Sequence, residues 1–217
     1  MRPTDTAAER PLPRRRRIGS ELRREQILAI AARHFERRPY SEVSTGAIAD
    51  ESGVGRPLIH YYFGTKRELY LEVVRRLALV PPNVPATVVE GIPEDAIEER
   101  IRVSIDYWLS VTARHRAMWT SAISIDAGDR DLQEILEQAD HVAAHRMLEA
   151  LCLHDHPQHE RLHTLLLAFG GLTRAAGRQW LVHNRLSRDD VFLLLTRTVL
   201  TIIRDVLPRL EADDRPL

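Results

Sequence analysis

The sequence predicts an all-α protein, and three observations carry this prediction. Apolar residues recur at helical spacing in the long segments that follow residue 20. No segment alternates apolar and polar residues as a half-buried strand does. Glycines, prolines and capping residues stand where the helical segments end. With 44% apolar residues in a chain of 217, we expect a packed core rather than global disorder.

The composition limits where the protein is expected to work. A single cysteine, Cys152, excludes an internal disulfide framework and favours a reducing cytoplasm. No stretch reaches the ~20 continuous apolar residues that span a bilayer. The basic run near the N-terminus is not followed by an apolar segment, so it does not have the pattern of a secretory signal. We expect a cytoplasmic protein with no membrane partner.

The formal net charge of zero hides an uneven distribution. Residues 1–80 contain 16 Lys and Arg against 10 Asp and Glu, whereas residues 81–217 contain 15 against 21. Such an asymmetry favours a polyanion as the partner of the N-terminal part.

The first element is predicted to be an arm followed by a helix. Residues 1–19 are rich in proline and polar residues, and they are expected to form a flexible basic arm that ends in Arg14–Arg17. A helical pattern begins near Ser20, with one broad apolar face. The residues of that face are Leu22, Ile27, Leu28, Ala31, Ala32 and Phe35.

Two short helices are predicted next. Ser44 is a plausible N-cap for the first, "TGAIADES", which Gly53 ends. The second runs from about residue 56 to 62, with Pro57 in its first turn, where a missing amide hydrogen costs nothing. Thr65 and Glu68 then form a capping box for the helix "KRELYLEVVRRLALV". Two short helices joined through "SGVG" have the layout of a helix-turn-helix, whose second helix enters the major groove of DNA.

The residue types on the second short helix suit that role. Arg56 stands at its start, and arginine can bond guanine bidentately. His60, Tyr61 and Tyr62 present rings with polar tips that suit phosphate oxygens, while Phe63 is expected to pack inward. Lys66, the only lysine of the chain, lies in the first turn of the next helix, where the dipole also favours a phosphate.

The stretch "STGAIADESGVGRPLIHYYFGTKRELYLEVV" resembles the DNA-binding region of the tetracycline-repressor (TetR) family of transcriptional regulators. The resemblance covers about residues 21–75. It implies a homodimer with a DNA-reading N-terminal unit and a C-terminal domain that senses a small molecule, with repression as the usual mode. Where this chain has His60, the family usually has tyrosine. The phosphate contact could therefore come from His60, Tyr61 or Tyr62. The family's DNA contacts fall on Thr45, Gly46, Arg56, Pro57, His60, Tyr62 and Lys66.

The arginine arm is predicted to contact DNA as well, with Arg16 and Arg17 as its contact residues. The arm could enter the minor groove or add non-specific attraction to phosphates. The alternative is a solubilising tail that touches nothing in particular.

Beyond a proline-rich connector, helices are predicted at 94–112, 114–126, 130–152, 158–183 and 188–207. Ser187 and Asp190 form a capping box for the last of them. That helix is apolar around most of its circumference, and the one before it carries small residues that let another helix approach. Both features predict a dimer interface, and two-fold symmetry predicts a palindromic operator. The predicted interface residues are Leu166, Gly170, Thr173, Phe192, Leu195, Val199, Ile202 and Ile203. A wholly intramolecular core is the alternative.

An effector pocket is predicted among the helices between the connector and the interface. Its apolar walls are Trp108, Trp119, Ile123 and Phe169, with Arg174 or Gln179 as a polar anchor. Such walls would suit a hydrophobic ligand, although a tryptophan in such a position is more often plain core than a ligand wall.

The stretch "CLHDHPQHERLH" carries Cys152, His154, His156, His159 and His163, which raises the question of a metal site. No paired C-x2-C or H-E-x-x-H pattern accompanies it, so we interpret it as an interhelical turn and expect no metal and no cofactor. Neither nucleophile–base motif nor phosphate loop is present, and we expect no enzyme. A helical adaptor that has lost DNA binding is a further alternative.

These expectations divide the chain into four parts. They are a flexible arm at 1–19, a helix-turn-helix DNA-binding domain at 20–66, a ligand-binding and dimerisation domain at 67–210, and a tail at 211–217.

Overall fold

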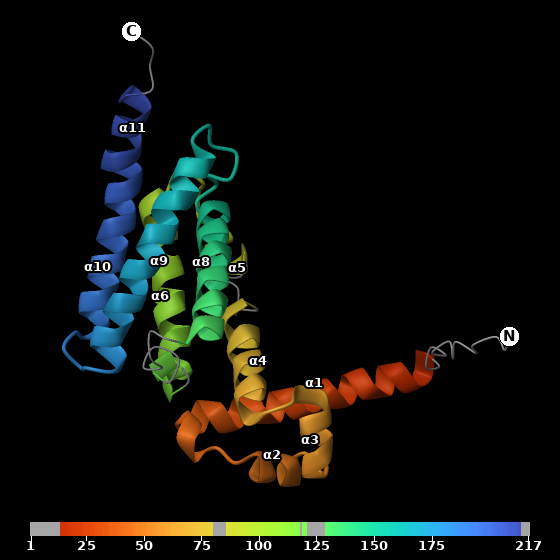
Figure 1. Cartoon of the computed structure of the whole chain (residues 1–217). Coiled ribbons are helices and arrows are strands. Elements are labelled where there is room, and N and C mark those ends of the chain that lie inside the picture. The colour runs from red at the N-terminus through yellow and green to blue at the C-terminus, as the bar shows by residue number, and fades with distance from the viewer. Residues whose placement is uncertain (1–13, 80–85, 118, 121–128, 214–217) are drawn as a thin grey trace, which may run out of the picture.

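The computed structural model describes residues 14–79, 86–117, 119–120 and 129–213, and these residues form helices and their connections without a strand. Figure 1 shows a small N-terminal unit lying across the lower end of a longer bundle of upright helices. The predicted all-α fold with an N-terminal helix-turn-helix unit and a larger helical C-terminal domain is confirmed. In the described part of the chain, no helix is long and apolar enough to cross a membrane.

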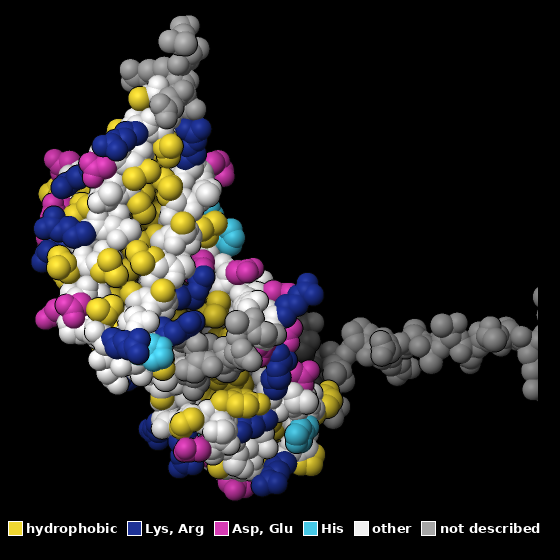
Figure 2. Space-filling model, turned by 60° about the vertical axis from the view of Figure 1, so that its left-hand side comes forward, with side chains coloured by type: hydrophobic (Ala, Val, Ile, Leu, Met, Phe, Trp, Pro, Cys, Tyr) yellow, Lys and Arg dark blue, Asp and Glu magenta, His cyan; other side chains and the backbone are white. Residues whose placement is uncertain are grey.

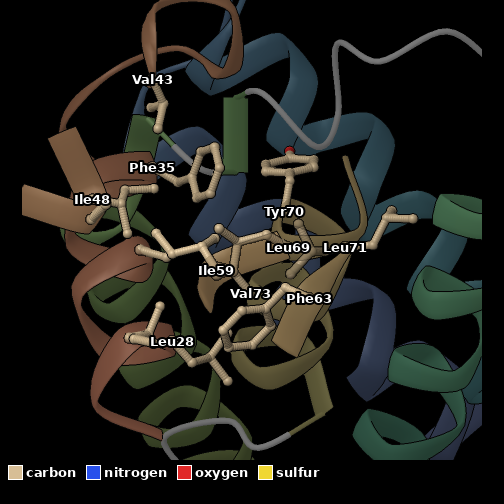
Figure 3. Close-up of a cluster of buried hydrophobic side chains, with 14 of the residues drawn as sticks. Leu28, Phe35, Val43, Ile48, Ile59, Phe63, Leu69, Tyr70, Leu71 and Val73 are labelled. Carbon is tan, nitrogen blue, oxygen red and sulfur yellow. The ribbon is translucent and has the colours of Figure 1, made fainter. Parts of the chain in front are cut away.

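The N-terminal unit consists of a long helix, a turn and three further helices. Helix α1 spans Arg14–Arg37, a 3-10 turn spans Tyr40–Glu42, and α2, α3 and α4 span Thr45–Glu51, Arg56–Phe63 and Lys66–Leu79. Their apolar faces meet in one core, in which large side chains from each element converge (Figure 3). The labelled members of this core are Leu28, Phe35, Val43, Ile48, Ile59, Phe63, Leu69, Tyr70, Leu71 and Val73.

Helix α1 begins six residues earlier than predicted. Its backbone is helical from Arg14, so the arginine run that was predicted to end a flexible arm belongs to the helix. Arginine is a good helix former, and a run of four offsets the unfavourable Gly19 within the same helix. The rest of the predicted arm lies outside the described residues.

The C-terminal domain is a bundle of long helices. Helix α5 spans Ala86–Val89, α6 spans Ile97–Arg114, α8 spans Arg130–Ala150 and α9 spans His159–Leu181. Helix α10 spans Arg188–Thr201, a π-helical turn spans Ile202–Val206, and α11 spans Leu207–Asp213, so that the three form one continuous rod (Figure 1). The predicted capping box at Ser187 and Asp190 is present. Of the predicted helix at 114–126, residues 118 and 121–126 lie outside the described residues.

Helix α4 joins the two parts of the molecule. Its Leu69 and Val73 are fully buried in the N-terminal core. The same core includes Leu132 and Ile135 of α8, which therefore packs directly on the N-terminal unit. The predicted domain boundary after residue 66 falls at the start of α4, a helix that contributes to both sides.

Candidate nucleic-acid interface

Local signals build the turn between α2 and α3. The Ser44 hydroxyl accepts a hydrogen bond from the Gly46 amide at 3.1 Å and caps α2, as predicted. Gly53 has a φ of 63°, which favours a residue without a side chain. Gly55 precedes α3 in an extended conformation, and Pro57 occupies the first turn of α3, as predicted.

Helix α3 has one buried face and one exposed face. Ile59 and Phe63 anchor the helix in the core, with 1% and 7% of their surface exposed. The opposite face points outward and brings four of the five DNA contacts predicted on α3 to the surface. Its exposed side chains are Arg56, Pro57, His60 and Tyr61.

The guanidinium of Arg56 lies directly against Gly46 at the start of α2. A Cβ atom added to Gly46 would be 2.7 Å from Nε and Cζ of Arg56, which is closer than van der Waals contact allows. The absence of a side chain at Gly46 therefore gives Arg56 its place between the two short helices. Arg56 and Gly46 were predicted separately as DNA contacts, and the fold brings them together.

His60 is held by its own helix end. Its Nδ1 lies 2.7 Å from the carbonyl oxygen of Gly64. A carbonyl oxygen only accepts, so Nδ1 carries the proton and the neutral ring offers Nε2 as an acceptor. The ring is exposed, and its orientation is fixed before any partner arrives.

The two tyrosines of α3 differ in orientation. Tyr61 is 79% exposed, whereas Tyr62 is half-buried and packs against the N-terminal core. The Tyr62 hydroxyl is hydrogen-bonded to the Ser20 hydroxyl of α1 at 3.0 Å. The hydroxyl of Tyr62 is therefore bonded within the domain, whereas the side chain of Tyr61 points to solvent.

Lys66 is placed at the start of α4 by contacts with the preceding 3-10 turn. Its Nζ lies 3.4 Å from the carbonyl oxygen of Ser41 and 4.4 Å from the centre of the Tyr40 ring. Next to it, Thr65 and Glu68 form the predicted capping box: the Thr65 amide donates to the Glu68 carboxylate at 2.6 Å, and the Glu68 amide donates to the Thr65 hydroxyl at 3.2 Å. The bonds from Thr65 lower the pKa of the Glu68 carboxyl below its usual value.

The remaining predicted contacts lie at the N-terminal ends of α2 and α1. Thr45 is half-buried at the first position of α2. Arg16 and Arg17 lie in the first turns of α1, which projects beyond the other helices of the N-terminal unit (Figure 1). The side chains of these two arginines are outside the described residues.

A cavity lies in the C-terminal domain where its pocket was predicted. It has a volume of about 190 Å³ and is lined by Trp108, Trp119, Phe169 and Arg174, all predicted as pocket residues. The rings of Trp108 and Trp119 meet edge to face, with 6.4 Å between their centres. The predicted Ile123 lies outside the described residues.

Only some of the polar groups that line this cavity were predicted from the sequence. Arg174 lines the wall but forms an ion pair with Asp140 of α8. Ser104 and Thr112 of α6 also line it, and their buried hydroxyl oxygens have no hydrogen-bond partner among the described residues. The cavity therefore suits an apolar molecule that carries a hydrogen-bonding group. Helical periodicity places Ser104 and Thr112 on one face of α6, but it does not tell a pocket from a core.

Comparison with known proteins identifies the N-terminal unit. The family model described as "Bacterial regulatory proteins, tetR family" matches residues 27–73, which run from the buried Ile27 in α1 to Val73 in α4. The helix-turn-helix unit of this chain is similar to that of the tetR family. The matched segment contains α2, α3 and the start of α4, so it includes the whole turn described above.

Curated relatives from this family are regulators by name. The HTH-type transcriptional regulator EthR of Mycobacterium tuberculosis is 25% identical over 135 residues, 61% of this chain and 62% of EthR. The HTH-type transcriptional regulator BetI of Agrobacterium fabrum is 40% identical over 91 residues, 41% of this chain and 44% of BetI. The HTH-type transcriptional activator FasR of Mycolicibacterium smegmatis is 38% identical over 60 residues, 28% of this chain and 27% of FasR. The chain thus spans less than two thirds of the length of these relatives.

Solved structures of tetR-family regulators share the fold of most of the chain. A tetR-family transcriptional regulator from Streptomyces coelicolor superposes with a TM-score of 0.58 at 21% identity and covers 90% of each chain. A TetR transcriptional regulator from Rhodococcus sp. RHA1 gives a TM-score of 0.58 at 20% identity over 86% of this chain and 98% of that chain. At these identities the likeness concerns the fold alone.

The predicted dimer residues divide into two groups. Leu166, Leu195, Val199 and Ile202 are buried within the single chain, with at most 9% of their surface exposed, and therefore have no surface for a partner. The remaining predicted residues are half-buried: Gly170, Thr173, Phe192 and Ile203.

The exposed apolar side chains of α10 are different ones. Leu193 and Leu194 are 58% and 39% exposed. Figure 2 shows hydrophobic side chains gathered along this face of the C-terminal domain, bordered by charged ones. Because α10 is apolar around most of its circumference, periodicity alone does not tell its inner face from its outer face.

The Cys/His stretch does not assemble as one group. Cys152 lies 3.4 Å from the Arg100 guanidinium, and His154 pairs with Asp155. In contrast, His159 and His163 of α9 face His141 and His145 of α8. Because α8 lies outside the stretch, the sequence did not single out these two partners.

Proposed function

We propose that the protein is a homodimeric DNA-binding transcriptional regulator that represses from a palindromic operator and is released by a small apolar effector. The proposed activity is binding rather than catalysis, and its site of action is cytoplasmic. One observation carries the proposal: the second helix of a tetR-family helix-turn-helix presents Arg56, His60 and Tyr61 on its exposed face. An arginine at the N-terminal end of such a helix is suited to bidentate bonds with guanine in the major groove.

Groups around α3 support phosphate binding beside the base contacts. Tyr61 carries an exposed hydroxyl, and His60 carries an outward nitrogen that donates once the ring is protonated. Lys66 adds a positive charge at the start of α4, near the dipole end that favours anions. Such contacts would fix the register in which Arg56 meets the bases.

The effector is proposed to bind in the cavity that Trp108, Trp119 and Phe169 line. A wall residue of this cavity, His115, has its Nδ1 3.0 Å from the Glu36 carboxylate of α1. A ligand that displaces the end of α6 would therefore act directly on the helix that supports α2 and α3. This contact provides a physical route from effector to DNA release.

The dimer is proposed to form through the face of α10 that bears Leu193 and Leu194. Two exposed leucines on one helix are suited to a partner with the same surface, as in a two-fold interface. In such a dimer the two α3 helices would lie about one helical turn of DNA, ~34–36 Å, apart.

Selection of bound sequences from random duplex DNA tests the proposal. The purified full-length chain is mixed with the duplex pool at about 0.15 M salt, since phosphate contacts make affinity steeply salt-dependent. A palindromic consensus is the expected result. Binding without a consensus would refute operator recognition and favour an adaptor that has kept the fold.

A further inference from the structure

Four histidines meet across the seam between α8 and α9. His141 and His145 are four residues apart on α8, and His159 and His163 are four residues apart on α9. This spacing places each pair on one face of its helix. The two helices pack side by side and are joined by the short segment 151–158 (Figure 1). The two pairs therefore face each other in register, His141 opposite His163 and His145 opposite His159.

The spacing of the rings is close to that of a metal centre. The ring centres are 5.3 Å apart for His141 and His163, and 5.9 Å apart for His145 and His159. The ring centres of His145 and His163 are 6.1 Å apart, and those of His159 and His163 on α9 are 6.4 Å apart. With a zinc–nitrogen distance of about 2.0 Å, four imidazoles around a tetrahedral ion have ring centres roughly 5 Å apart. For these four ring pairs, closing the site requires the ring centres to approach by up to about 1.4 Å, together with rotation of the side chains.

The side chains are free to make this adjustment. As the rings stand, no three His, Cys, Asp or Glu side chains in the described part of the chain converge on one point, because the rings stack or meet edge to face. His141 and His145 are exposed, so their χ angles can rotate and an ion can enter from solvent. The buried Nδ1 of His159 has no hydrogen-bond partner among the described residues, a cost that coordination of the ring would offset.

We propose that His141, His145, His159 and His163 bind one divalent transition-metal ion of the class that prefers imidazole nitrogen, for which zinc is the probe. The ion would clamp α8 to α9, two helices that also form walls of the effector cavity through Asp140 and Gly170. Glu160, which interacts electrostatically with His163, supplies negative charge beside the site. The metal site does not depend on the proposed DNA binding.

Zinc titration of the full-length chain tests the proposal. The protein is prepared without a histidine tag, and zinc chloride competes with a chromophoric chelator in a non-coordinating buffer. We expect one zinc ion per chain and an affinity that falls about tenfold or more in His163→Ala and in the milder His145→Gln. His154→Ala and His183→Ala, which alter exposed histidines outside the quartet, are the controls and should bind as the parent does. Circular dichroism verifies that each variant is folded.

Cobalt binding supplies a second readout. This readout would not change in the variants if the four histidines only stabilised the fold. Tetrahedral Co²⁺ has strong visible absorption, and this absorption should appear in the parent and be lost in His145→Gln. The proposal is overturned if the parent takes up no zinc, or if the quartet variants and the controls bind zinc equally well.

Discussion

At the scale of single residues, the neighbouring Tyr61 and Tyr62 have different roles. We expect Tyr61→Phe to weaken operator binding by about tenfold, because it removes an exposed hydroxyl suited to a phosphate. Tyr62→Phe should leave DNA affinity unchanged and lower the free energy of unfolding by about 1 kcal/mol, because it removes the bond to Ser20. Fluorescence anisotropy with the selected duplex and urea denaturation measure the two effects. The reverse pattern would show that Tyr62 turns outward on DNA.

The contact between Gly46 and Arg56 is open to a similarly direct test. Gly46→Ala places a methyl group where the Arg56 guanidinium lies, and the flexible end of that side chain gives way. Operator affinity should therefore fall while the thermal midpoint changes little. Gly55→Ala is the matched control, because its Cβ would meet only the Pro57 ring at 3.5 Å, an ordinary contact. Equal losses in both variants would contradict the special position of Arg56.

The orientation of a single side chain could be predicted where residues close to it in the sequence determine it. Phe63 could be placed in the core because large consecutive rings cannot all face inward, and the structure buries it. The inward orientation of Tyr62 depends on Ser20, which lies 42 residues earlier in the chain, and no local pattern reports such a contact. The pairing of Arg174 with Asp140 was missed for the same reason.

At the scale of elements, helix caps have consequences that pH can reveal. The bonds from Thr65 hold the pKa of Glu68 below its usual value of about 4.5 in the folded state. A carboxylate of this kind stabilises the fold above its unfolded pKa, and the stabilisation is lost as the pH falls through the folded pKa. Between about pH 5 and pH 3 the parent should therefore lose more stability than Glu68→Gln. Thermal midpoints across this range measure the difference, with Glu137→Gln on the exposed face of α8 as control. Parallel curves for the parent and Glu68→Gln would count against the role of the cap.

The elements themselves were largely predictable because their ends are marked locally. Ser44, the Thr65–Glu68 pair and the Ser187–Asp190 pair cap the helices that they were predicted to cap. The predicted start of α1 was wrong because an arginine run is compatible with both a helix and a disordered arm. The π-helical turn at Ile202–Val206 carries no glycine or proline, and it lay within a segment predicted as plain helix.

At the scale of the whole molecule, the proposed dimer forms through α10. We expect Leu193→Glu to convert the dimer to a monomer, because it places a charge on the proposed apolar interface. Leu22→Glu is the matched control, since Leu22 is 60% exposed against 58% for Leu193 but lies on α1. Sedimentation velocity measures the mass of each. A Leu193→Glu protein that remains dimeric would place the interface elsewhere.

Besides the packing of α8 on the N-terminal core, ion pairs connect the two parts of the molecule. Arg67 at the start of α4 pairs with Asp129 and Asp131 at the N-terminal end of α8, each at 2.7 Å. His115 lies close to Glu36 of α1, as described above. These contacts join the DNA-facing unit to the helices around the cavity, so a change in the cavity has a short path to α3. None of them could be read from the sequence, since each joins residues at least 62 positions apart.

The central claim is that α3 reads a specific DNA sequence through Arg56. The most direct measurement is the affinity of Arg56→Ala for the selected duplex and for a scrambled duplex, at several salt concentrations. Arg209→Ala, an exposed arginine on α11 at the far end of the molecule, is the control (Figure 1). The account predicts that Arg56→Ala loses about 1–3 kcal/mol of discrimination between the duplexes, while Arg209→Ala keeps it. If Arg56→Ala discriminated as well as the parent protein does, the assignment of α3 as the recognition helix would be wrong.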